Sequence, residues 1–241
     1  MYPEICRIGP LTVYSYGLML VVAFLSAGFL AARRAAVEGI DPDAVYSLTF
    51  YALLAGIAGA RIFFVLGHLS FYLEAPREIF QLQRGGLSWF GGLLGGLGAA
   101  VWYLRRRRLG IMRTSDCIIP FVALAHAIGR IGCFLNGCCA GRESVFGLYF
   151  PVHQAVLVPV QLYASLFLVA IFVLLRIVQE RPHREGDVFF AYLLCYGILR
   201  FFLEFWRSGH AVVFAGLTLF QLLSTGLVVI ALIKLSVLRR Q

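Results

Sequence analysis

The sequence predicts an all-α protein, a polytopic bundle of membrane-spanning helices. Hydrophobic residues make up 61% of the 241 positions and charged residues only 14%, whereas a soluble domain averages about 25% charged residues. Mean hydropathy is +0.85. Seven apolar runs approach the roughly 20 residues that a membrane-spanning helix needs. We therefore expect one membrane domain over residues 1–241, with its core built between helices.

The seven predicted spans are separated by short polar segments. They cover residues 11–32, 44–66, 85–104, a run from 117 into the segment around 130, 156–175, 188–205 and 212–233. The N-terminus lacks the basic segment and the A-x-A site of a cleavable signal peptide. The first run is therefore expected to stay in the membrane.

Basic clusters follow the first, third, fifth and seventh spans, so all of them fall on one side of the membrane. They are Arg33-Arg34, Arg105 to Arg108, Arg176 to Arg184, and Lys234 with Arg239 and Arg240. The positive-inside rule then predicts seven spans with the N-terminus outside and the C-terminus cytoplasmic. The net charge of +9 follows from this pattern and gives no reason to expect binding to nucleic acid.

Four ionisable residues lie within the predicted spans, in the half opposite the basic clusters: Arg61, Arg130, Arg200 and Glu204. An ionisable residue at membrane depth is a functional-site hypothesis, because its burial costs at least about 2.5 kcal/mol. Snorkelling to the headgroups is the alternative for Arg130, and a purely structural Arg-Glu-Arg ladder is the alternative for residues 200–207. The arginines nevertheless outnumber their acid partner, which indicates an anion, and phosphate suits the planar guanidinium.

Two local patterns accompany these charges. Tyr196, Arg200, Glu204 and Arg207 have spacings of four, four and three residues, which predicts one shared helix face. The glycine-rich segment 85–96 predicts either close helix packing or room for a lipid headgroup.

The segment 126–141, HAIGRIGCFLNGCCAG, contains glycines dense enough to break a helix. Its cysteines, Cys133, Cys138 and Cys139, have a C-x4-C-C spacing that differs from paired C-x2-C zinc sites, so no metal is expected. A disulfide between Cys133 and Cys138 is the pairing that we expect in an oxidising exterior.

Several short motifs resemble those of the prolipoprotein diacylglyceryl transferase family, in the same order along most of the chain. The segment 129–137, GRIGCFLNG, resembles the family pattern G-R-x-G-N-F-x-N-G. The other matching motifs are Tyr16-Gly17-Leu18-Met19, Gly59-Ala60-Arg61, the glycine-rich segment 85–92, Pro159-Val160-Gln161-Leu162-Tyr163, and Tyr196 to Arg207. Each motif is weak alone, and their common order makes the resemblance specific.

The resemblance implies transfer of the diacylglyceryl group from phosphatidylglycerol to the lipobox cysteine thiol of a preprolipoprotein, in the bacterial cytoplasmic (inner) membrane. The implied partners are phosphatidylglycerol, preprolipoprotein signal peptides and membrane lipids, with no metal or organic cofactor. Arg130 and Arg200 would be catalytic, holding the phosphate and stabilising its charge as it leaves. The implied substrate-binding residues are Tyr16, Arg61, Asn136, Gly137, Tyr196, Glu204 and Arg207.

The chain departs from the family pattern at positions that concern activation of the thiol. Phe90 stands where typical members carry histidine, and Cys133 and Cys138 replace an asparagine and a common glutamate. Val158 and Ala164 replace the histidine and glutamate of the fifth-helix motif.

His126 lies four residues before Arg130. On a continuous helix both share a face, which makes His126 a candidate for the missing base, with a structural histidine as the alternative. The residues themselves leave open an anionic-lipid transporter or flippase, and a related lipid transferase with another acceptor.

Overall fold

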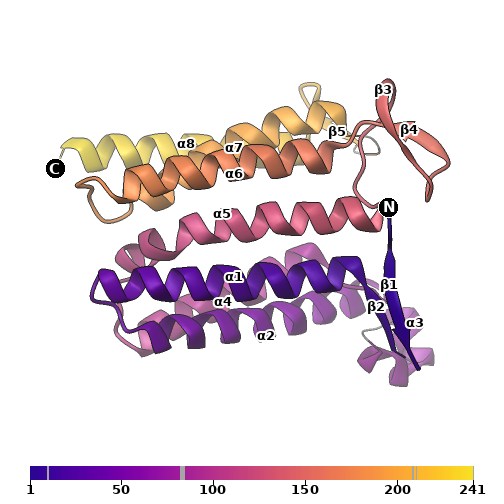
Figure 1. The fold of residues 1–241 in the computed structure, drawn as a ribbon, viewed down its shortest axis with the longest axis horizontal. Helices are drawn as coiled ribbons and strands as arrows, with labels where there is room; N and C mark the ends of the chain where they lie inside the picture. Colours follow the sequence, from indigo (N-terminus) through magenta and orange to yellow (C-terminus); the bar gives the residue numbers. More distant parts are fainter. Residues whose placement is uncertain (10, 82–84, 208, 210, 241) are drawn as a thin grey trace. The chain divides into compact units, whose positions relative to one another are not determined.

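The computed structural model describes residues 1–9, 11–81, 85–207, 209 and 211–240, and Figure 1 shows its helices and strands. The helices are α1 (Ser15–Val37), α2 (Pro42–Gly67), α3 (Leu69–Glu74), α4 (Trp89–Arg106), α5 (Ile111–Asn136), α6 (Val160–Gln179), α7 (Asp187–Leu203) and α8 (Leu219–Arg240), with 3-10 turns η1 (Pro76–Phe80) and η3 (Glu204–Trp206). The strands are β1 (Glu4–Ile8), β2 (Leu11–Tyr14), β3 (Glu143–Phe150), β4 (Ala155–Leu157), β5 (Val212–Phe214) and β6 (Leu217–Thr218).

Six helical segments in the described part of the chain are long and apolar enough to cross a membrane: α1, α2, α5, α6, the segment Asp187–Trp206, and Leu219–Val237. Large apolar side chains on these helices are exposed, with Leu25 at 70% and Leu166 at 67%. Exposed leucine at this level suits contact with hydrocarbon. The chain is thus a mostly helical, multi-pass membrane protein. The predicted third span corresponds to α4, which contains five glycines and two terminal arginines and is not among these six.

Three of the predicted spans begin later than expected, because their first residues form strands. Residues 11–14 belong to the β1–β2 hairpin, 155–157 to the β3–β4 hairpin, and 212–218 to the β5–β6 hairpin, all antiparallel. Gly9 and Gly216, with φ of +60° and +77°, lie at two of the reversals, where glycine adopts the left-handed conformation at little cost. The all-α prediction is therefore incomplete at the helix ends.

The chain divides into two compact units, of which one comprises residues 32–114 and the other comprises residues 1–31 and those from Ser115 onward. In the 32–114 unit, α2 packs against α4 through glycines. A Cβ atom on Gly91 would overlap the carbonyl oxygen of Gly59, and one on Gly95 would overlap that of Ala55. The glycine-rich segment predicted as a packing face thus packs against α2, and backbones approach closely because side chains are absent.

The other unit contains a core between α5, α6 and α7, with Ala123, Leu168, Leu175 and Val188 almost fully buried. The last three helices run side by side in Figure 1. Helix α8 packs closely on α7, since a Cβ atom on Gly197 would lie 2.9 Å from Cγ2 of Val228. These contacts hold α7, which carries Tyr196 and Arg200.

A buried carboxylate fixes the opposite end of α7. Asp116 on α5 accepts hydrogen bonds from the backbone N–H groups of Gly186 (2.5 Å) and Phe189 (2.8 Å). The Gln179 amide donates to the carbonyl of Asp116 at 2.9 Å. Asp116 therefore supplies acceptors that the first turn of α7 lacks, and it joins three helices at one point.

Candidate functional site

Arg200 and Glu204 form a buried ion pair at the C-terminal end of α7. Nη1 of Arg200 lies 2.5 Å from Oε2 of Glu204, and their side chains are 12% and 1% exposed. The guanidinium also lies over the Phe220 ring, 4.7 Å from its centroid. The spacing of four residues predicted this contact, and the pair neutralises one arginine of the site.

A capping box at the start of α8 holds Glu204 in place. Thr218 and Gln221 exchange hydrogen bonds, from the Thr218 N–H to Gln221 Oε1 and from the Gln221 N–H to Thr218 Oγ1. The Thr218 hydroxyl then donates to Oε1 of Glu204 at 2.9 Å. Our reading of the sequence missed both residues, although T-x-x-Q before an apolar run is a recognisable signature. Thr218 and Gln221 thus hold Oε1 of Glu204 in position, while Oε2 pairs with Arg200. Among the described residues, Glu204 is the carboxylate for which an ion pair with a site arginine is seen.

Arg207 does not continue the helical face that we predicted. Helix α7 ends at Leu203, η3 follows, and Arg207 is extended with φ −86° and ψ 151°. Its backbone forms an isolated antiparallel bridge with Gly141. Arg207 is therefore paired as a strand residue and does not extend the helix. The pKa of Arg207 is lowered by burial and by the positive charges of Arg200 and Arg130. Three arginines are thus near enough to repel one another across the site.

Arg130 carries the charge that the protein does not neutralise. Its Nε donates a hydrogen bond to Nε2 of His126 at 3.3 Å. Within the described residues, it has no ion pair with a carboxylate. The His126 ring lies 5.3 Å from that of Tyr196, which stacks on buried Tyr192 at 5.7 Å. The expected one-turn relation of His126 and Arg130 is therefore present, and it leaves Arg130 as an unpaired cation.

The helix ends within this glycine-containing segment, as its composition indicated, but α5 continues past Gly129 and Gly132 to Asn136. Gly132 allows α1 to pack closely on α5. A Cβ atom at this position would lie 2.8 Å from Cβ of Met19 and 3.5 Å from Cδ2 of Tyr16. The chain turns only at Gly137, whose φ is +77°. Tyr16 thus lies against α5 one turn before Asn136.

Three thiols meet around this turn, one before it and two after it. The Sγ atoms of Cys133, Cys138 and Cys139 all lie within 4.8 Å of one another, and all three cysteines are free. The pKa of Cys139 is lowered by hydrogen bonds with the other two thiols and by the charges of Arg207 and Arg130. The disulfide expected between Cys133 and Cys138 is not formed in this structure, and the spacing did not predict that all three thiols meet.

Arg61 lies in the other unit and binds backbone carbonyls. It is 7% exposed, and its guanidinium donates to the carbonyls of Glu78 (2.6 Å), Ile79 (2.8 Å), Gly85 (2.8 Å) and Gly86 (3.0 Å). The Tyr72 ring lies 5.3 Å from the guanidinium carbon. Its donors are therefore already used to hold the segment between α2 and α4.

Two positions that depart from the family pattern have become packing positions. Val158 and Ala164 are 9% and 3% exposed and contact Val160 and Leu203 in one apolar cluster. Phe90, in contrast, is 43% exposed and packs edge to face on Trp89. None of these three side chains can accept a proton.

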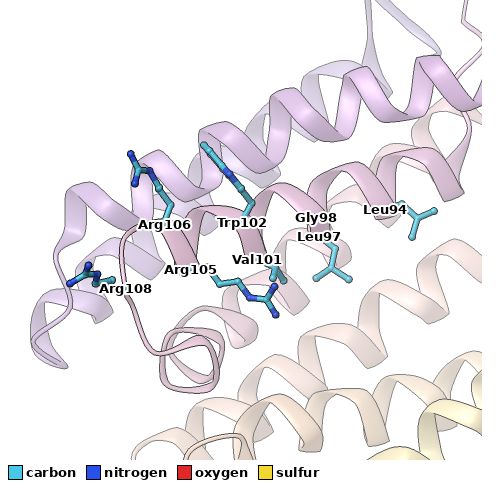
Figure 2. A pocket seen from close by; sticks show the side chains of 8 residues that line it. All are labelled: Leu94, Leu97, Gly98, Val101, Trp102, Arg105, Arg106 and Arg108. Atoms are coloured by element: carbon cyan, nitrogen blue, oxygen red, sulfur yellow. The ribbon is translucent and has the colours of Figure 1, made fainter.

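An open cavity of about 740 Å³ lies along α4 and contains none of the predicted site residues. Figure 2 shows its lining: Leu94, Leu97, Gly98, Val101, Trp102, Arg105, Arg106 and Arg108. It offers apolar and basic groups but no acid, nucleophile or base, so its volume does not mark the reactive site.

Comparisons with known proteins agree along the whole chain. The family model described as "Prolipoprotein diacylglyceryl transferase" matches residues 3–237. A phosphatidylglycerol–prolipoprotein diacylglyceryl transferase of Enterococcus faecalis is 33% identical over 252 residues, covering 97% of this chain and 89% of the relative. One of Staphylococcus aureus strain Newman is 34% identical over 251 residues, covering 99% and 89%. The chain therefore belongs to the prolipoprotein diacylglyceryl transferase family.

Proposed function

We propose that this protein transfers the diacylglyceryl group of phosphatidylglycerol to the lipobox cysteine thiol of prolipoproteins. The family match over residues 3–237 and the names of the relatives support this activity. The observation that carries it in the structure is the arginine cluster, in which the charges of Arg200 and Arg130 both act on Arg207 and the one paired carboxylate, Glu204, is bound to Arg200. Such a cluster at membrane depth favours an anion, and phosphatidylglycerol supplies one.

The reaction breaks a carbon–oxygen bond and leaves charge on a phosphate. The acceptor sulfur attacks the carbon of the diacylglyceryl group that is bonded to the phosphate oxygen, and a thioether forms at this carbon. The carbon–oxygen bond breaks, and glycerol phosphate departs with the bonding electrons. Arg130 is the arginine best suited to bind this phosphate, because it makes no ion pair with a carboxylate of the described chain. Arg200, held by Glu204, adds a positioned positive charge that stabilises the leaving group without reorganisation.

The contact between His126 and Arg130 links phosphate binding to base catalysis. Because an arginine Nε can only donate, Nε2 of His126 accepts and therefore carries no proton. In this arrangement its lone pair is occupied. When Arg130 turns its donors to the lipid phosphate, Nε2 becomes free to take the proton of the acceptor thiol. A base that becomes active only after the lipid binds would compensate for the family histidine replaced by Phe90.

Other predicted substrate contacts are distributed around these groups. Tyr196, next to His126, and Tyr16, against Gly132, are proposed to donate hydrogen bonds to the headgroup. Asn136 and Gly137 form the turn that leads to the cysteines. For Arg61, the four carbonyl contacts favour a structural role in its own unit over direct binding of substrate.

We further propose that the protein acts as one transferase domain in the bacterial cytoplasmic (inner) membrane. The family match extends across both units, which supports one functional domain. Helix α4, with 18 residues, is proposed as a seventh span. An odd number of spans, with Arg105 and Arg106 at the end of α4, supports a topology with the N-terminus outside and the C-terminus in the cytoplasm.

The activity is tested with purified full-length protein, phosphatidylglycerol vesicles and a lipobox peptide. We expect a peptide that carries diacylglyceryl thioether, together with stoichiometric glycerol phosphate, detected by mass spectrometry. A peptide with serine in place of its cysteine is the control and should remain unmodified. Movement of lipid between leaflets without a peptide product would instead identify a lipid transporter.

Arg130→Lys is expected to lower kcat by about 100-fold, the range seen when one transition-state donor is removed. Lysine keeps the charge but loses the two-pronged contact with phosphate. The same change at exposed Arg181 is the control and should leave turnover unchanged. Steady-state kinetics of both variants provide the measurement, and full activity of Arg130→Lys would remove this residue from the site.

His126→Ala and His126→Gln are both expected to lose turnover while still binding phosphatidylglycerol, because neither side chain takes a proton from a thiol near neutral pH. Turnover at several pH values and lipid binding are measured in parallel. Near-normal turnover of His126→Gln would show that the ring is structural, since the amide preserves hydrogen bonding without basicity.

Reporter fusions test the proposed topology. Reporters inserted after Arg108 and at the C-terminus are both expected to give a cytoplasmic signal, because both points follow basic clusters. A periplasmic signal at either point would contradict the seven-span arrangement.

A further inference from the structure

The proposed transfer reaction assigns no role to the three thiols that meet after α5. Cys133 lies in the last turn of that helix, and Cys138 and Cys139 follow the reversal at Gly137. Their Sγ atoms lie within 4.8 Å of one another. The other cysteines of the chain, Cys6, Cys117 and Cys195, are outside this cluster, which we call the thiol triad.

The loop backbone is arranged so that the third thiol joins the other two. Cys139 has φ +63°, a left-handed conformation that costs a non-glycine residue roughly 1–2 kcal/mol. The Cys138 N–H donates to the Cys133 carbonyl at 3.0 Å. The reversal at Gly137 and the conformation of Cys139 accompany the meeting of all three thiols, whereas a disulfide would need only two.

Side chains outside the triad support the same loop. Nε2 of Gln161 donates to the Cys138 carbonyl at 2.6 Å, and Nε2 of His153 lies 2.9 Å from the Gly137 carbonyl. Gln161 is 1% exposed, and its Oε1 has no hydrogen-bond partner among the described residues. Outer groups of this kind orient the ligands of metal sites. A buried free acceptor also offers a partner for a water molecule on an incompletely coordinated ion.

We infer that the thiol triad binds one thiophilic divalent cation of the zinc class through three thiolates. A zinc–sulfur distance of about 2.3 Å places tetrahedral ligands about 3.8 Å apart, so the sulfur atoms need to move by at most about an ångström. Binding releases the remaining thiol protons, forms three metal–sulfur bonds and transfers no electrons. Three thiolates and a divalent ion have a net charge of −1, which the single positive charge of Arg207, electrostatically close to Cys139, offsets.

Cobalt is the spectroscopic probe for this site. Purified full-length protein, kept reduced, is titrated with Co²⁺ and the thiolate-to-cobalt charge-transfer absorption is followed, then displaced with Zn²⁺. We expect saturation at one ion per chain and displacement by zinc. Cobalt absorption does not depend on lipid transfer. A failure of metal binding can therefore be distinguished from a failure of the proposed transferase activity.

Cys139→Ser is the informative variant, because Cys139 is exposed and its replacement leaves the core unchanged. It is expected to weaken cobalt binding at least 10-fold, the lower limit for losing a group that supports a metal. Cys6→Ser, an exposed cysteine outside the triad, is the matched control and should bind as the parent does.

Three results would overturn the inference. They are the absence of charge-transfer absorption in the reduced parent protein, unchanged binding in Cys139→Ser, and a Cys133–Cys138 disulfide in protein isolated from native membranes without reductant. In the last case the triad would have only one thiolate left to bind an ion.

Discussion

The ion pair between Arg200 and Glu204 is the interaction on which the arrangement of the site depends. Glu204 is almost completely buried, and removing one partner of a buried pair costs roughly 3–5 kcal/mol because the other charge remains without compensation. The pair is anchored on both sides, by the helical spacing within α7 and η3 and by Thr218 at the start of α8. It therefore fixes the end of one helix relative to the beginning of the next, and Arg200 is held in position before any lipid arrives.

The chain accommodates arginine at membrane depth in three different ways. Arg200 is neutralised by a carboxylate, and Arg61 is solvated by four backbone carbonyls. Arg130 has a histidine nitrogen, which supplies an acceptor but no negative charge. The first two arrangements are complete without a ligand. The third is not, and this difference distinguishes Arg130 as the arginine to which we assign direct binding of the phosphate.

Much of this could be predicted from the sequence because hydrophobic periodicity and charge are local properties. The apolar runs predicted the helices, and four-residue spacing predicted the Arg200–Glu204 and His126–Arg130 contacts. The errors concern contacts between distant segments. Arg207 leaves the helix and its backbone pairs with Gly141, and Gly132 lies inside α5 in close contact with Tyr16 and Met19. Neither partner can be identified from spacing. The thiol triad was missed for the same reason, since a left-handed residue is not evident from cysteine positions.

The glycine contact between α2 and α4 has a mechanical consequence. Gly59 and Gly91 touch backbone to backbone, so at this contact neither residue has a side chain whose rotamer could change to open a gap. Separation of these helices would expose backbone that no flexible group can cover. The close backbone contact therefore favours movement of α2 and α4 as one body over their separation.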